Sequence, residues 1–149
     1  MSSPLEATWN VEVKKAQRRV EVRMAGLFRE ADIRAFDAAY REATDRFAGT
    51  AHVVLADMRG LRTLAANVGA IFGESIAYAR TRGVALCAHL SDETVLRLQT
   101  ARIARSSSVE DDVTVDVASL EEAQLLCEEA RQRLEDGSKL ADLRASLTS

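Results

Sequence analysis

The chain has 149 residues, of which 47% are hydrophobic and 29% are charged. This length suits one domain with a buried core, and this balance excludes an intrinsically disordered chain. The formal net charge of −3 and the isoelectric point near 5.5 argue against a general nucleic-acid binder, which normally carries a basic excess.

The sequence predicts a cytoplasmic location. No apolar run approaches the roughly 20 residues that a membrane-spanning helix needs. The first residues, Met-Ser-Ser-Pro-Leu-Glu, lack the basic and apolar regions of a signal peptide. A disulfide between Cys87 and Cys127 is conceivable, but two cysteines in a leaderless chain more often stay reduced and buried. Neither belongs to a CxxC motif, so we expect no metal site.

The first 26 residues have the pattern of a β-hairpin. Residues 9–13 and 20–24 are apolar at alternate positions, and the polar residues 14–19 join them. Two such runs with a polar turn predict a hairpin that buries one face. Gly26 follows, at a position where a strand can end or bend.

Two helix–strand units come next. Apolar residues at spacings of three and four predict a helix over residues 30–47. The continuous apolar run 53–56 predicts a central strand that is covered on both faces. A second helical stripe spans residues 68–79 and ends before Gly83, and residues 84–90 form another apolar strand.

A third helix is predicted to begin at residues 91–94. Its spacing places Val95, Leu98 and Arg102 on one side. Residues 106–108 are three serines, which we interpret as a polar connector.

The last strand and helix follow this connector. Residues 113–117 are apolar at alternate positions and form the strand. Ser119 and Glu122 form a capping box. The Ser119 hydroxyl can accept from the backbone amide of Glu122, and the Glu122 carboxylate can bond back to the amide at the start of the helix. A final helix then runs to Leu134.

The order of these elements is ββαβαβαβα. Helices that alternate with apolar strands predict an α/β fold with parallel central strands, and the opening hairpin makes the sheet mixed. We expect about five strands and about four helices in one domain, residues 1–134. Residues 135–149 form a tail or a short extra helix, in which Leu140, Leu143 and Leu147 could support a homodimer.

Asp57 follows the buried strand 53–56, where open α/β sheets place ligands. A phosphoacceptor aspartate at this place would need a metal ion held by further carboxylates. The first two strands end instead in Lys14-Lys15 and Ala25-Gly26. We therefore expect Asp57 to cap loop amides or to pair with Arg59.

Arg59 and Arg62 flank Gly60 just before a helix, and two interpretations are open. Two guanidinium groups and free helix amides can bind an anion. Two solvated arginines on an exposed loop are the alternative that we favour. The chain has no Ser/His/Asp or Cys/His set at recognisable spacing and no P-loop, so the sequence predicts neither an enzyme nor a cofactor.

Three stretches of the chain resemble a STAS domain, the family of bacterial anti-sigma-factor antagonists. VEVRMAG at 20–26 resembles the second strand with its closing glycine, and VVLADMRGL at 53–61 resembles the strand before the switch loop. VTVDVASLEEA at 113–123 resembles the last strand and the start of the last helix. The resemblance runs from about residue 9 to residue 134 and implies a STAS-like fold.

Phosphorylated members of this family carry D-x-S-G and then D-S-S-G-x-G, and a partner kinase modifies the serine before the glycine. Here Asp57-Met-Arg-Gly60 has Arg59 in place of the first serine. The second motif falls on residues 65–69, where Ala66 or Asn67 occupies the acceptor position. We therefore predict that the phospho-switch is absent, with phosphorylation of Thr63, the loop's one hydroxyl, as a further alternative.

The resemblance implies a non-catalytic regulatory module that binds a protein, with an anti-sigma factor or a kinase-like regulator as the expected partner. The residues expected on the partner-facing surface are Arg59, Arg62, Thr63, Asn67 and Glu74. The alternative is a STAS-like protein that binds a lipid or another small apolar ligand, which would need a pocket between sheet and helices.

Overall fold

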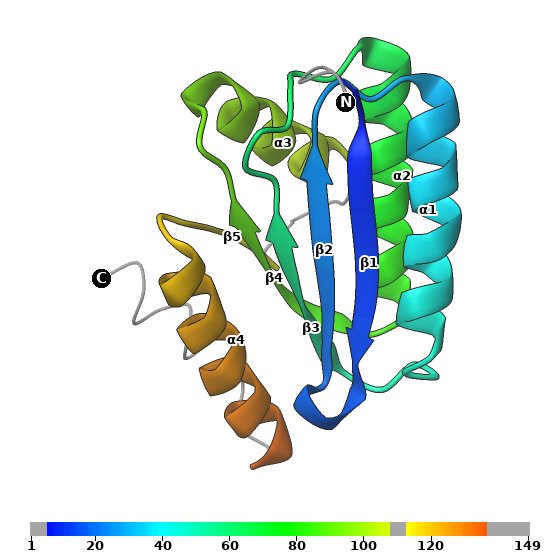
Figure 1. Ribbon diagram of the computed structural model, residues 1–149. Helices are drawn as coiled ribbons and strands as arrows, with labels where there is room; N and C mark the ends of the chain where they lie inside the picture. Colours follow the sequence, from blue (N-terminus) through cyan, green and yellow to red (C-terminus); the bar gives the residue numbers. More distant parts are fainter. Residues whose placement is uncertain (1–5, 108–112, 137–149) are drawn as a thin grey trace.

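The computed structural model describes residues 6–107 and 113–136, which build one five-stranded sheet with helices on both faces (Figure 1). The strands are β1 (Thr8–Lys14), β2 (Arg19–Ala25), β3 (His52–Asp57), β4 (Val84–Leu90) and β5 (Thr114–Val117). They lie in the order β1-β2-β3-β4-β5, and only the β1–β2 pair is antiparallel. The predicted mixed α/β sheet is thus confirmed.

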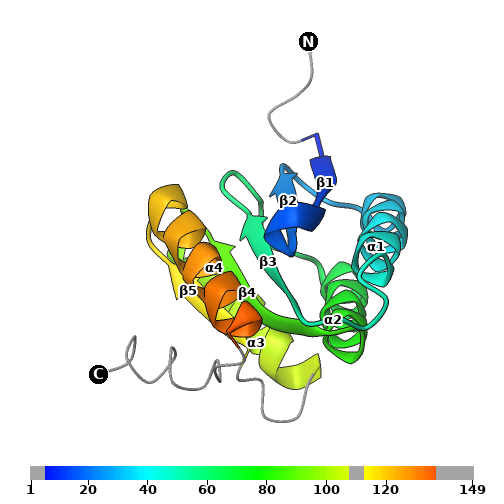
Figure 2. The same ribbon diagram turned by 90° about the horizontal axis from the view of Figure 1, so that it is seen from below.

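The helices cover the two faces unequally. They are α1 (Glu30–Asp45), α2 (Ala66–Thr81), α3 (Thr94–Ser107) and α4 (Leu120–Glu135), and the short 3-10 turn η1 (Lys15–Gln17) joins β1 to β2. Figure 2 shows α1, α2 and α3 on one face of the sheet and α4 on the other. The order of elements is the predicted ββαβαβαβα. No helix of the described residues is long and apolar enough to cross a membrane.

The opening hairpin buries one face, as its alternation predicts. Trp9, Val11 and Val13 stand opposite Met24, Val22 and Val20 in the register of the pair. This side packs under α1, where the Trp9 ring meets the Phe36 ring edge-on at a centroid distance of 6.0 Å.

The central strand β3 is buried along its whole length. Successive side chains of a strand point to opposite faces. Val54 and Ala56 therefore join the core under α1 and α2, while Val53 and Leu55 join the core under α4. The predicted coverage on both faces is confirmed.

The side of α3 that carries Val95 and Leu98 faces solvent. Val95 is 65% exposed and Leu98 is 59% exposed, whereas the buried side carries Leu96, Thr100 and Ala104. The three buried residues are spaced by four and therefore lie on one side of the helix. The helix also continues through Ser107, so the predicted serine connector largely belongs to it.

Both cysteines are free and buried, as expected. Cys87 belongs to the core on the α1–α2 side and Cys127 to the core under α4. Burial raises the pKa of the Cys127 thiol to about 11, so it stays protonated at neutral pH. The predicted dimerisation leucines of residues 137–149 lie outside the described residues.

Candidate partner-binding surface

The loop between β3 and α2, residues 58–65, lies at the carboxyl end of the central strands. This edge is where parallel sheets commonly carry their sites. Met58, Leu61 and Leu64 are buried and anchor the loop in the core, while the residues between them point to solvent. The amide of Met58 also donates to the carbonyl of Leu90, 2.8 Å away at the end of β4.

Gly26 holds the loop from the side of β2. Its amide donates to the carbonyl of Gly60 at 2.9 Å, and its carbonyl accepts from the amide of Arg62 at 3.0 Å. The residue has φ +83°, and a Cβ atom there would lie 2.1 Å from the carbonyl oxygen of Glu6. Only glycine fits this conformation and this approach, so the predicted strand-ending Gly26 also fixes the loop.

Helix α3 holds the loop from the other side. The side-chain amide of Gln99 donates to the Leu64 carbonyl at 2.7 Å, and its oxygen accepts from the Leu64 amide at 2.8 Å. The Asp92 carboxylate accepts from the amide of Gly60 at 3.1 Å. The loop and α3 therefore form one unit. Sequence reasoning missed Gln99 on α3 and Asp92 in the bend before it, because a single glutamine or aspartate gives no signal.

Asp57 is nearly buried, and both of its oxygens are engaged. One oxygen accepts from the backbone amide of Arg59 at 3.2 Å and from its Nε at 2.9 Å. The other accepts from Nη2 of Arg59 and Nη1 of Arg23, each at 2.8 Å. Burial by itself raises the pKa of Asp57, but hydrogen bonds from Arg59 and the charges of Arg59 and Arg23 outweigh it and lower the pKa.

These contacts give Asp57 the role expected from the sequence, which is to cap a loop amide and pair with Arg59. They also place two positively charged guanidinium groups on the carboxylate, which disfavours a metal cation there. The described residues contain no group of three or more potential metal ligands.

The five residues predicted at the surface are all exposed, but they differ in freedom. Arg59 is 43% exposed and fixed to Asp57, whereas the side chain of Arg62 has no partner among the described residues. Asn67 donates weakly to Glu30 at 3.4 Å, and Glu74 lies two turns further along the same face of α2. Because the guanidinium of Arg59 is bound to Asp57, the anion-site interpretation loses one of its two arginines.

Helix α2 is fixed to α1 by a row of polar contacts. The Ser75 hydroxyl donates to the Asp37 carboxylate at 2.6 Å. The Arg41 guanidinium lies 4.5 Å from the centre of the Tyr78 ring, and the Tyr78 hydroxyl donates to Asp45 at 2.7 Å. The surface formed by the loop and α2 is therefore supported on three sides, by β2, α3 and α1.

Comparison with solved structures identifies the architecture. The crystal structure of an anti-sigma factor antagonist from Mycobacterium paratuberculosis matches with a TM-score of 0.58 and 14% identity. The match covers 85% of this chain and 98% of that chain. The chain has a STAS-like fold. No protein-family model matches the sequence, and no curated protein is significantly similar to it.

Within this STAS-like fold, the positions assigned to the missing phosphoacceptor lie at the start of α2. Ala66 and Asn67 are the first two residues of the helix, and both side chains are exposed. Neither carries a hydroxyl group. Thr63 is exposed too, three residues before the helix.

The space between the sheet and helices α1 and α2 is small. It amounts to about 20 Å³ and is lined mainly by apolar side chains, among them Phe36, Tyr40 and Phe72. A cavity needs about 10–15 Å³ of such space to hold a single water molecule. A lipid or another apolar ligand would therefore fit there only if the helices moved away from the sheet.

Proposed function

We propose that the chain is a non-catalytic regulatory module that binds a protein partner through the loop 58–65 and the exposed side of α2. The observation that carries this proposal is the way the loop is held. Its backbone is bonded to β2, β4 and α3, while Arg62, Thr63, Asn67 and Glu74 stay on the surface. A surface that is already ordered loses little conformational entropy when a partner binds.

The partner that we propose is an anti-sigma factor or a kinase-like regulator. The likeness to a structure named as an anti-sigma factor antagonist supports this class of partner. The proposal transfers only the class, because 14% identity leaves the individual surface residues free to differ.

We propose further that this surface is constant and needs no serine phosphorylation. Arg59 stands where the first serine of the phosphorylated pattern would be, and its guanidinium neutralises Asp57. Ala66 and Asn67 carry no phosphorylatable group. The remaining hydroxyl, on Thr63, is the site at which mass spectrometry of protein from its native cell would reveal a switch, and we expect no phosphate there.

The test is a quantitative pull-down of the partner with Arg62→Glu, compared with Arg46→Glu as the control. Both arginines are exposed, but Arg46 follows α1 at the amino end of the sheet. We expect Arg62→Glu to reduce partner capture at least about tenfold and Arg46→Glu to leave it unchanged. Equal capture by both variants, with unchanged melting temperatures, would exclude the loop as the binding surface.

A further inference from the structure

Two helix faces outside the loop expose large aliphatic side chains. Helix α3 exposes Val95 and Leu98, and α4 exposes Leu125, which is 66% accessible. Leu27, at 39%, is the other large apolar residue exposed among residues 6–107 and 113–136. Single apolar side chains are common on protein surfaces, so these two helix faces become candidates for an interface only through the charges that surround them.

The exposed face of α3 is apolar and positively charged. Val95, Leu98 and Arg102 are spaced by three and four residues and therefore share one face, and Arg105 continues it by another turn. Arg102 and Arg105 are exposed and form neither a hydrogen bond nor an ion pair with the described residues. The charge of Arg105 acts on Asp116, whereas Arg102 has no such neighbour in the described part of the chain and is available to a partner.

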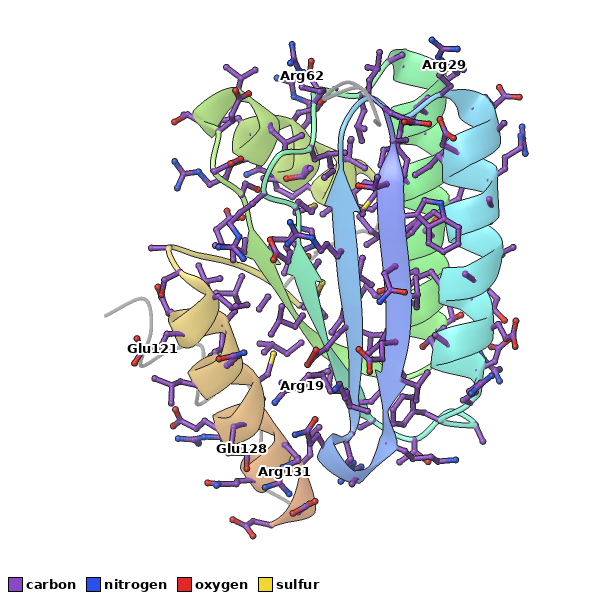
Figure 3. All side chains as sticks on the ribbon, viewed as in Figure 1. Arg19, Arg29, Arg62, Glu121, Glu128 and Arg131 are labelled. Carbon is purple, nitrogen blue, oxygen red and sulfur yellow. The ribbon has the colours of Figure 1, made fainter. Side chains whose placement is uncertain are left out.

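The exposed face of α4 is apolar and negatively charged. Leu125 is flanked three and four residues away by Glu121, Glu122, Glu128 and Glu129. A shallow hollow of about 300 Å³ lies beside it, between Leu125, Leu126 and three of these glutamates. Figure 3 shows Glu121 and Glu128 on α4, away from the end of the molecule that carries Arg62.

The glutamates around Leu125 are only partly neutralised. Glu128 pairs with Arg131, and Glu129 lies 3.5 Å from Arg133. Glu121 has no partner among the described residues. The surroundings of Leu125 therefore keep a negative charge, opposite in sign to those of Leu98.

The α3 face and the α4 face are complementary in charge, but the two faces of one molecule cannot contact each other. Helix α3 covers one face of the sheet and α4 the opposite face (Figure 2). We propose that α3 of one copy docks on α4 of a second copy, with Leu98 in the hollow beside Leu125 and Arg102 facing the glutamates. Such a head-to-tail contact uses two different patches and leaves one of each free, so it can continue to a third copy.

A second copy explains both faces at once. An anionic membrane would attract the arginines of α3 but repel the glutamates of α4. An unrelated acidic protein would account for α3 and leave Leu125 uncovered. The contact involves few apolar side chains, so the association should be weak, should grow with protein concentration and should weaken with salt.

The experiment is analytical ultracentrifugation of two variants, each of which blocks one face. Leu98→Asp places an acid against the acidic face, and Leu125→Lys places a base against the basic face. We expect wild-type protein at low salt to form dimers and longer species, and each variant alone to associate at least about tenfold more weakly. An equimolar mixture of the two variants should form a dimer and stop there, because only one intact face of each kind remains.

One control variant and one further test variant complete the experiment. Leu27→Asp changes another exposed leucine and should associate like the wild type. Arg102→Glu should weaken association about tenfold without loss of folding, because this side chain is exposed and unpaired.

Several outcomes would overturn the proposal. Wild-type protein that stays monomeric at about millimolar concentration would do so, because the contact would then be too weak to form. So would a mixture of the two variants that fails to dimerise, or association that depends on Leu98 but not on Leu125. A flotation assay with phosphatidylglycerol vesicles tests the membrane alternative. If the wild type floats with the vesicles and Leu98→Asp does not, the α3 face binds a membrane instead.

Discussion

The two ends of strand β3 both carry a polar cluster, but the cluster at the amino end is buried and the one at the carboxyl end reaches the surface. At the amino end, His52 is fully buried and its ring stacks on Phe47 at a centroid distance of 4.3 Å. At the carboxyl end, Asp57 bonds two exposed arginines beside the loop 58–65. The difference lies in the partners: the side-chain partner of His52 is buried, whereas those of Asp57 are exposed and can meet another molecule.

The His52 cluster is neutral and saturated. Nδ1 lies 2.8 Å from the carbonyl of Thr50, which can only accept, so this nitrogen carries the proton. Nε2 then accepts from the Thr44 hydroxyl at 2.7 Å. Burial lowers the pKa of His52, because an imidazolium ion would be poorly solvated there.

The largest effect should come from removal of this ring. His52→Ala leaves the Thr50 carbonyl and the Thr44 hydroxyl without partners and opens a cavity beside Phe47. We expect a loss of about 2–4 kcal/mol in the free energy of unfolding, measured by urea denaturation. A loss below about 0.5 kcal/mol would show that the amino end tolerates change like a surface.

Gln99→Ala should have the next largest effect. It removes the side chain that bonds both the amide and the carbonyl of Leu64. We expect a loss of about 1–2 kcal/mol, together with faster hydrogen exchange at the Leu64 amide. Gln132→Ala on the exposed side of α4 is the matched control and should leave both quantities unchanged.

The pH dependence of the free energy of unfolding should distinguish His52, at the amino end of β3, from Asp57 at its carboxyl end. The folded pKa of His52 lies below its unfolded value, so the unfolded chain binds the proton first and stability falls as pH decreases below about 6.5. The slope cannot exceed about 1.4 kcal/mol per pH unit for one group.

Asp57 acts in a lower pH range. Its folded pKa is depressed, so its contribution is present above its unfolded value near 3.9 and is lost as pH falls through the folded pKa. In urea denaturation between pH 7.5 and 5, His52→Gln should therefore reduce the slope, whereas Asp57→Asn should keep it. The opposite pattern would mean that the two clusters have been assigned the wrong charge states.

Arg62→Ala should have the smallest effect on stability. The side chain is exposed and has no partner among the described residues, so we expect a change within about 0.5 kcal/mol. Circular dichroism on heating would measure it. A larger loss would show that Arg62 supports the fold and is not a free surface residue.

The position of the loop 58–65 in the fold was predictable, but the contacts that hold it were not. The apolar run 53–56 and the acid after it placed the loop at the carboxyl end of a central strand, and the pairing of Asp57 with Arg59 followed from their proximity in the chain. Gln99 and Asp92 were missed because they act across 35 and 32 residues of sequence. Val95 and Leu98 were assigned to one stripe whose exposure the sequence left undecided.

The sequence by itself determined the order of elements, the mixed sheet and the buried faces of β1, β2 and β3. It could do so because strands alternate every two residues and helices repeat every 3.6, which are local rules. The tertiary structure decided which side of α3 is buried, which distant residues hold the loop, and that helices α3 and α4 present opposite charges on opposite faces. Those outcomes depend on which surfaces meet in the folded chain, and no spacing along the sequence records that.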